Sequence, residues 1–178
     1  LINLVENLLS VTRIEDGKMN LHLETELIEE VINEALNHIS HKKDEHRIEV
    51  KANDEFILAK IDAGLIIQVI INIVDNAIKY TPKGSMISIE TFKHKDFVEI
   101  QIADDGAGIS DKDKEKLFEM FYTVKHEVID GRRGLGLGLA LCKAIIVAHG
   151  GNIAVKDNIP HGTIFSFTLP IKEVEIHE

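Results

Sequence analysis

Hydrophobic and polar positions along the chain follow two patterns, one with the period of a helix and one with the period of a strand. Helices are expected over residues 1–15, 27–39, 62–80, 111–118 and 135–148. Strands are expected at 21–25, 47–52, 56–61, 86–92, 97–103, 152–156 and 163–169. Most neighbouring strands are joined as hairpins, as at residues 93–96. This order predicts an α+β fold, a two-layer α/β sandwich, rather than a doubly wound parallel sheet.

Residues suited to helix ends support these boundaries. Gly17 suits a C-terminal cap after the first helix, and Asp62 suits the N-cap of the third. The turn sequence at residues 81–84 then ends the third helix near Tyr80.

Composition excludes several classes of protein. The chain has 178 residues, of which 44% are hydrophobic, which suffices for one domain. A net charge of −10 without a basic stripe argues against nucleic acid as a partner. Cys142 is the single cysteine, so we expect no internal disulfide and a reducing, cytoplasmic setting. Because the chain starts with Leu1, we expect it to be part of a longer protein.

The third predicted helix carries polar residues on one face. Asn72, Asn76, Lys79 and Tyr80 are spaced three or four residues apart within an Ile- and Val-rich segment. A carboxamide oxygen can bind Mg²⁺, a lysine can meet a phosphate, and a tyrosine ring can lie against a base. The alternative is that the two asparagines are solvated or bonded to neighbours.

A glycine-containing turn follows the strand at 97–103. The carboxylate of Asp104 can accept a hydrogen bond from an exocyclic amine such as that of adenine, and Gly106 and Gly108 allow the backbone to approach a ligand. The alternative is a plain Asp-Gly turn, which is common.

Glycine occupies every second position where the helix at 135–148 begins. The free N–H groups of a helix N-terminus favour phosphate. The segment is neither a Rossmann fingerprint nor a Walker A loop, and its alternative is a flexible hinge. The preceding polar loop carries cations that either neutralise a terminal phosphate or are solvated. These cations are Lys125, Arg132 and Arg133. The glycine segment that follows them consists of Gly134, Leu135, Gly136, Leu137, Gly138 and Leu139.

The order and spacing of these segments resemble the sensor histidine kinases. Residues 72–82 resemble the N box of that family, 104–109 the G1 box, 118–121 the F box and 134–140 the G2 box. Residues 162–170 are similar to the family's final strand, and residues 4–17 to the end of its dimerisation and phosphotransfer helices. The loop before the G2 box looks most like that of sensor kinases of the osmosensitive potassium system, the Kdp type.

The resemblance implies the Bergerat ATP-binding fold, with ATP and Mg²⁺ as ligands. It implies Asn76 as the metal ligand, Asn72 and Lys79 as catalytic residues, Tyr80 against the base and Asp104 on the adenine amine. Further implied contacts are Gly106, Gly108, Ile109, Phe118, Arg133, the G2 residues 134–139, and Thr163 at the adenine end. The chain departs from the family pattern at two positions. Thr123 replaces a frequent basic residue, so no phosphate contact is expected there, and Leu135 replaces a frequent Ser or Thr, which removes one possible hydroxyl contact.

The expected function is transfer of the ATP γ-phosphoryl group to a histidine on an upstream dimerisation domain in two-component signalling. Expected partners are that domain and a response regulator. The full-length protein is expected to be a membrane-anchored homodimer, with this domain in the cytoplasm. Residues 1–18 would be the end of the dimerisation domain, 19–172 the kinase domain and 173–178 a tail. None of the nine histidines lies in the acceptor context of the family.

Two other functions remain open from the sequence. One is an ATP-hydrolysing conformational switch like gyrase, MutL or Hsp90, although Asn72 cannot take a proton as the Glu of several such proteins does. The other is a degenerate nucleotide-binding or dimerisation module, against which the retention of all the boxes argues.

Overall fold

A mixed five-stranded sheet forms one layer of the protein. The computed structural model describes residues 9, 12, 13, 20–39, 45–51, 56–124 and 136–172. The strand order is β2-β4-β5-β7-β6, with β2 parallel to β4 and every other neighbour antiparallel. The strands are β2 (Arg47–Val50), β4 (Met86–Lys93), β5 (Phe97–Asp104), β6 (Ile153–Asp157) and β7 (Thr163–Pro170).

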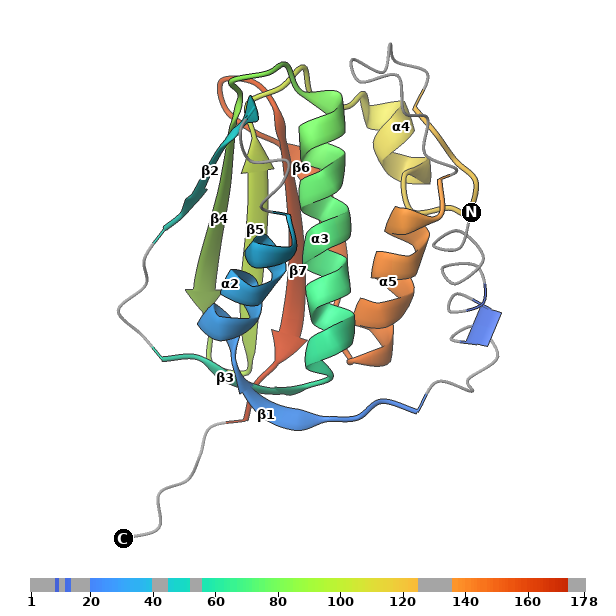
Figure 1. Cartoon of the computed structure of the whole chain (residues 1–178). Helices are drawn as coiled ribbons and strands as arrows, with labels where there is room; N and C mark the ends of the chain where they lie inside the picture. Colours follow the sequence, from blue (N-terminus) through green and yellow to red (C-terminus); the bar gives the residue numbers. More distant parts are fainter. Residues whose placement is uncertain are drawn as a thin grey trace, which may run out of the picture.

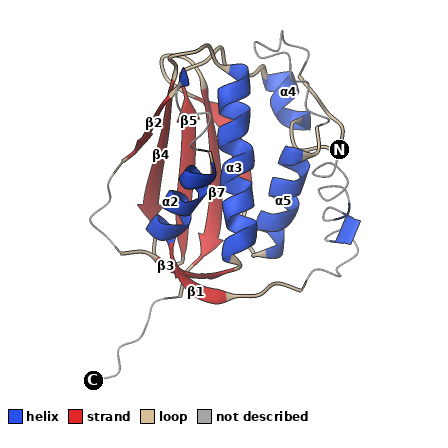
Figure 2. Ribbon diagram, in the orientation of Figure 1, coloured by secondary structure: helices blue, strands red, loops and turns tan. Residues whose placement is uncertain are grey.

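Helices cover one face of this sheet (Figures 1 and 2). The helices are α2 (Ile28–His38), α3 (Ala63–Tyr80) and α5 (Gly138–Ala148), with the short α4 (Asp111–Lys116) beside the upper part of α3. Alternation along β4, β5 and β7 places one side of each strand against the helices, and residues such as Ile89, Ile100 and Phe167 are fully buried there. The two-layer α/β sandwich expected from the sequence is confirmed.

Helix α3 lies at the centre of the helical layer. Its N-cap, Asp62, accepts a hydrogen bond from the backbone N–H of Leu65 through Oδ1. By length and composition α3 could cross a membrane, but its apolar residues pack into the core with α2, α5 and the sheet. The chain leaves the helix at Thr81 in an extended conformation, as expected for a residue that precedes Pro82.

A histidine joins the end of α5 to the start of α3. The backbone N–H of Asp62 donates to Nε2 of His149 at 3.1 Å, and Nδ1 of His149 donates to the carbonyl of Ile145 at 2.7 Å. The two bonds require the neutral Nδ1–H tautomer. They hold α5 antiparallel to α3, so that the start of α5 lies beside the carboxyl half of α3 (Figure 1).

Some element boundaries differ from those expected. The strand predicted at 21–25 is β1 (Glu24–Leu27), because pairing with β3 (Leu58–Ile61) fixes its position. Helix α5 begins at Gly138 rather than residue 135, and Gly136 before it has a positive φ of 72° that no helix allows. Helix α4 ends at Lys116, two residues early. The helix expected over residues 1–15 and the tail at 173–178 fall mostly or wholly outside the described residues.

Candidate functional site

The predicted site residues that the structure describes converge at one end of the sheet. Asn76, Lys79 and Tyr80 lie in the last turns of α3, Asp104 ends β5, Thr163 starts β7 and Gly138 starts α5. The end of α3, the end of β5 and the start of β7 lie at the upper part of Figure 1, whereas α5 starts lower, beside the middle of α3. Asp104 and Thr163 are in direct contact, and Gly138 lies beside Asn72, so segments far apart in the sequence are brought together in two groups along α3.

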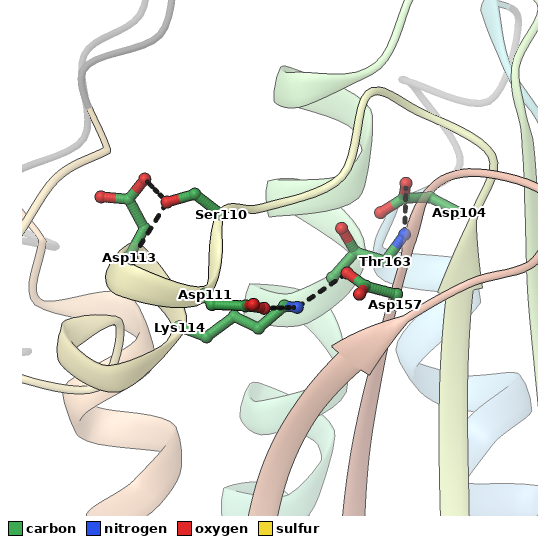
Figure 3. Close-up of polar contacts among 7 residues, drawn as sticks. All are labelled: Asp104, Ser110, Asp111, Asp113, Lys114, Asp157 and Thr163. Atoms are coloured by element: carbon green, nitrogen blue, oxygen red, sulfur yellow. Dashed lines mark hydrogen bonds and ion pairs between the residues drawn. The ribbon is translucent and has the colours of Figure 1, made fainter.

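One carboxylate oxygen of Asp104 accepts hydrogen bonds from the protein, and the other accepts none from the described residues. The residue is only 8% exposed, and its Oδ1 accepts a hydrogen bond from the backbone N–H of Gly106 at 2.9 Å. The same Oδ1 accepts from the backbone N–H of Thr163 at 3.3 Å (Figure 3). Among the residues that the structure describes, none donates to Oδ2. Burial raises the pKa of the Asp104 carboxyl above its usual range, and the two backbone hydrogen bonds partly offset that effect. The free oxygen is suited to accept a hydrogen bond from an amine.

Asn72 carries a buried donor without a partner. Its Nδ2 makes no hydrogen bond of regular geometry within the described residues, although the amide lies close enough to the buried thiol of Cys142 in α5 to lower the pKa of that thiol. A side chain added at Gly138 would place its Cβ 4.0 Å from Cγ of Asn72, so the carboxamide lies beside the start of α5. An unsatisfied buried amide costs about 1–3 kcal/mol, so such a group calls for an explanation. An acceptor such as a phosphate oxygen at the N-terminus of α5 would provide one.

The other polar residues of α3 remain partly accessible. Asn76, Lys79 and Tyr80 are each half-buried, whereas Ile73, Val74 and Ala77 beside them are buried. This separation confirms that the predicted polar face of the helix is partly open.

Three of the predicted glycines approach protein atoms rather than open space. A Cβ on Gly106 would lie 2.7 Å from the methyl group of Thr81, and one on Gly136 would lie 2.5 Å from the carbonyl oxygen of Tyr122. Gly108, with a φ of 80°, faces the carbonyl oxygen of Gly162. These glycines therefore allow the loops around the site to pack against each other, a role that the sequence did not reveal.

Several apolar site candidates belong to the core. Leu137 and Leu139 are buried, and Ile109 packs against the core. The ring of Phe118 stands edge-on to that of Phe165, with centroids 6.3 Å apart. Their ligand contacts stay a prediction, and Arg133, Gly134 and Leu135 lie outside the described residues, as do Lys125 and Arg132.

Three further residues support the loops around Asp104 and the end of α3. Nδ2 of Asn158 donates to the carbonyl of Asp104 at 2.8 Å, and Nδ1 of His161 donates to that of Gly106 at 3.1 Å. His46, which is buried, bonds to Thr81 at the end of α3. None of these residues stands in a recognisable motif, because each acts on a segment far away in the sequence.

Comparison with known proteins agrees with this geometry. The family model described as histidine kinase-, DNA gyrase B- and HSP90-like ATPase matches residues 61–173. Sensor protein KdpD of Clostridium acetobutylicum is 43% identical over 170 residues, which are 96% of this chain and 19% of KdpD. Sensor histidine kinase WalK of Bacillus subtilis is 34% identical over 97% of this chain and 29% of its own length. The chain thus spans less than a third of each relative.

Solved structures of histidine kinases share the fold. The mycobacterial sensor histidine kinase MprB matches 83% of this chain and 97% of its own, with a TM-score of 0.72 and 27% identity. Full-length ShkA in complex with AMPPNP matches 94% of this chain and 35% of its own, with a TM-score of 0.78 and 25% identity. Histidine kinase ThkA in complex with response regulator protein TrrA matches 96% and 49%, with a TM-score of 0.74 and 26% identity. This chain belongs to the histidine kinase-, DNA gyrase B- and HSP90-like ATPase family, and within it is a sensor histidine kinase catalytic domain of two-component signalling.

Proposed function

We propose that this domain binds Mg-ATP and transfers the γ-phosphoryl group to a histidine on a dimerisation domain upstream. Two observations carry the proposal: Nδ2 of Asn72 in α3 makes no regular hydrogen bond and lies beside the start of α5, and one carboxylate oxygen of Asp104 is free. The first group suits a phosphate and the second suits the adenine amine.

The remaining residues take roles between these two points. Tyr80 offers a flat ring to the base, and Thr163 holds Asp104 through its backbone N–H. Lys79 supplies a positive charge for phosphate oxygens. The N-terminus of α5 adds unpaired N–H groups, with Gly138 leaving the backbone bare.

Asn76 is the residue proposed to hold Mg²⁺. Its carboxamide lies one helical turn after Asn72, on the half-open side of α3. Mg²⁺ takes few protein oxygens and keeps waters and phosphate oxygens as its other ligands, so one carboxamide suits it. When bound, the ion would neutralise charge on the transferring phosphate.

Phosphoryl transfer to histidine is favoured over hydrolysis by the chemistry of Asn72. A carboxamide cannot remove a proton from water, so Asn72 can orient groups but cannot act as a general base. An acceptor imidazole brings its own nucleophilic nitrogen. The domain therefore needs to position and stabilise phosphate, and a strong base is unnecessary.

The relatives suggest the partners of the whole protein. ThkA was solved with the response regulator protein TrrA, and ShkA with AMPPNP. By analogy, we propose that a response regulator receives the phosphoryl group from the dimerisation domain. A homodimeric, membrane-anchored parent with this domain in the cytoplasm completes the proposal.

Titration calorimetry with Mg-ATP tests the site. Asn76→Ala should weaken Mg-ATP binding at least about 10-fold, since it removes a ligand of the metal. Asn33→Ala, on the exposed side of α2, is the matched control and should leave affinity unchanged. Equal affinities of Asn76→Ala and the wild type would refute the metal assignment.

A second experiment tests the reaction. The domain is mixed with a separately produced dimerisation domain of a related kinase and ATP labelled at the γ-phosphate. We expect label on the histidine of that domain. Release of free phosphate at a comparable rate, without labelled histidine, would instead support the ATPase switch.

A further inference from the structure

We propose that Asn158, in the turn between β6 and β7, is a positioning residue that aims the carboxylate of Asp104 at the adenine amine. This inference rests on the proposed function, because it concerns the same nucleotide site. Asn158 itself does not touch the nucleotide in this proposal. It acts by fixing the backbone from which Asp104 projects.

The amide of Asn158 is fixed by hydrogen bonds on both sides. Its Nδ2 donates to the carbonyl of Asp104 at 2.8 Å, and its Oδ1 accepts from the backbone N–H of Ile159 at 2.9 Å. Its own backbone N–H donates to the carbonyl of Gly162 at 3.0 Å. The side chain therefore has one orientation, with the donor toward Asp104.

The same turn reaches Asp104 from other directions. The backbone N–H of Thr163 donates to Oδ1 of Asp104, and Nδ1 of His161 donates to the carbonyl of Gly106 two residues further on. Gly162 lies so close that an added Cβ would be 2.0 Å from the carbonyl oxygen of Asp104. Both the carbonyl and the carboxylate of Asp104 are thus held by residues 158–163.

An ion pair steadies the turn from outside. Asp157, the last residue of β6, accepts from Nζ of Lys114 at 2.8 Å, and the same ammonium bonds to Asp111 at 2.8 Å (Figure 3). Asp157 and the Asp104–Thr163 contact lie on neighbouring strand ends in this view. The turn is therefore anchored to α4 on one side and to Asp104 on the other.

This arrangement explains why Oδ2 of Asp104 stays available. Oδ1 is occupied by two backbone donors, and the clamped carbonyl prevents the residue from rotating as a unit. Loss of the Asn158 bond would free that carbonyl and let the direction of Oδ2 vary. Recognition of the adenine amine would weaken, whereas contacts with phosphate at the other end of the site would not.

Comparison of two nucleotides with and without the amine tests the proposal. Inosine triphosphate carries an oxygen where ATP carries the exocyclic amine, so it cannot donate to Asp104. Mg²⁺ complexes of both are titrated into the wild type, Asn158→Ala and the control Ile159→Ala. Ile159 lies in the same turn, with its side chain 89% exposed.

For Asn158→Ala, we expect ATP affinity to fall about 10-fold and inosine triphosphate affinity to change less than about 2-fold, the size expected for one hydrogen bond. The kcat for phosphoryl transfer at saturating ATP should stay unchanged, with the loss confined to KM. Ile159→Ala should match the wild type for both nucleotides.

Two results would overturn the inference. An equal loss of affinity for ATP and inosine triphosphate would show that Asn158 only supports the fold. Calorimetric melting of each variant would reveal such a loss of stability independently. Unchanged ATP affinity of Asn158→Ala, while the wild type binds ATP, would also reject it. Failure of the wild type to bind ATP at all would overturn the proposed function itself.

Discussion

His46 and Thr81 are joined by a buried hydrogen bond, with Nε2 of the histidine 2.9 Å from Oγ1 of the threonine. The hydroxyl of Thr81 donates its proton to the carbonyl of Ala77 at 2.6 Å, so it accepts from His46. His46 therefore carries its proton on Nε2, and its buried Nδ1 has no partner in the described part of the chain. Because the methyl group of Thr81 packs under Gly106, the pair links the segment before β2 to the loop of Asp104.

Thr81→Val should destabilise the fold by about 1–3 kcal/mol, since it leaves the buried Nε2–H of His46 without its hydroxyl acceptor. Urea denaturation measures this change. In a His46→Phe background, which has no N–H to satisfy, the same substitution should cost about 1 kcal/mol less. Additive losses in the double variant would show that the two residues do not act together.

Asp104→Asn should reduce Mg-ATP affinity about 10- to 100-fold, because an amide N–H₂ replaces the free oxygen that accepts from adenine. The amide oxygen can still accept from Gly106 and Thr163, and no charge is buried. The variant should therefore melt at the same temperature as the wild type or higher at pH 7. Calorimetric melting and titration of the same sample check both effects, and a strongly lowered melting temperature would contradict this account.

The raised pKa of Asp104 also predicts how pH affects the domain. The folded state binds this proton more tightly than the unfolded state, so burying the ionised carboxylate costs stability at neutral pH. That cost should be relieved as pH falls through the raised pKa, while ATP affinity should fall over the same window. In Asp104→Asn, this contribution to both pH profiles should be absent.

Gly162→Ala should destabilise the domain by about 3 kcal/mol or more, since the added Cβ would meet the carbonyl of Asp104 and the residue has a φ of 114°. Gly84→Ala is a matched control. Gly84 has a similar positive φ of 84° but nothing within 4 Å of an added Cβ, so only the backbone strain of about 1–2 kcal/mol applies. Equal losses by urea denaturation would show that crowding at Gly162 is unimportant.

Cys142 should be inert in the folded protein. Burial in α5 raises the pKa of its thiol to about 12, so almost no thiolate is present at pH 8. Alkylation by iodoacetamide should be at least about 1,000-fold slower in native protein than in urea, where the thiol has an ordinary pKa. Mass spectrometry of timed samples measures both rates. Fast labelling of the native protein would mean that α5 opens readily.

The repeating pattern of apolar residues was enough to predict the layers of the fold. Burial of alternate residues in β4 and β5, and of one stripe along α3, follows directly from backbone geometry, which is the same in every protein. The N-cap at Asp62 was predictable for the same reason, because its bond reaches only three residues along the chain. Boundaries were less certain where pairing or a glycine decided them, as for β1 and α5.

The residues with candidate chemistry could be picked out along the chain, because Asn72, Asn76 and Asp104 stand in recognisable motifs. Their surroundings emerged only from the folded structure. Asn158 and Asp104 are 54 residues apart, and His46 and Thr81 are 35 apart. Such bonds join a side chain to a loop whose position is set by the packing of the whole domain, and no local period records them. For the same reason, the sequence could not predict that the amide of Asn72 lacks a regular hydrogen bond or that one oxygen of Asp104 is free. Whether a polar group is satisfied depends on all of its neighbours in the folded protein.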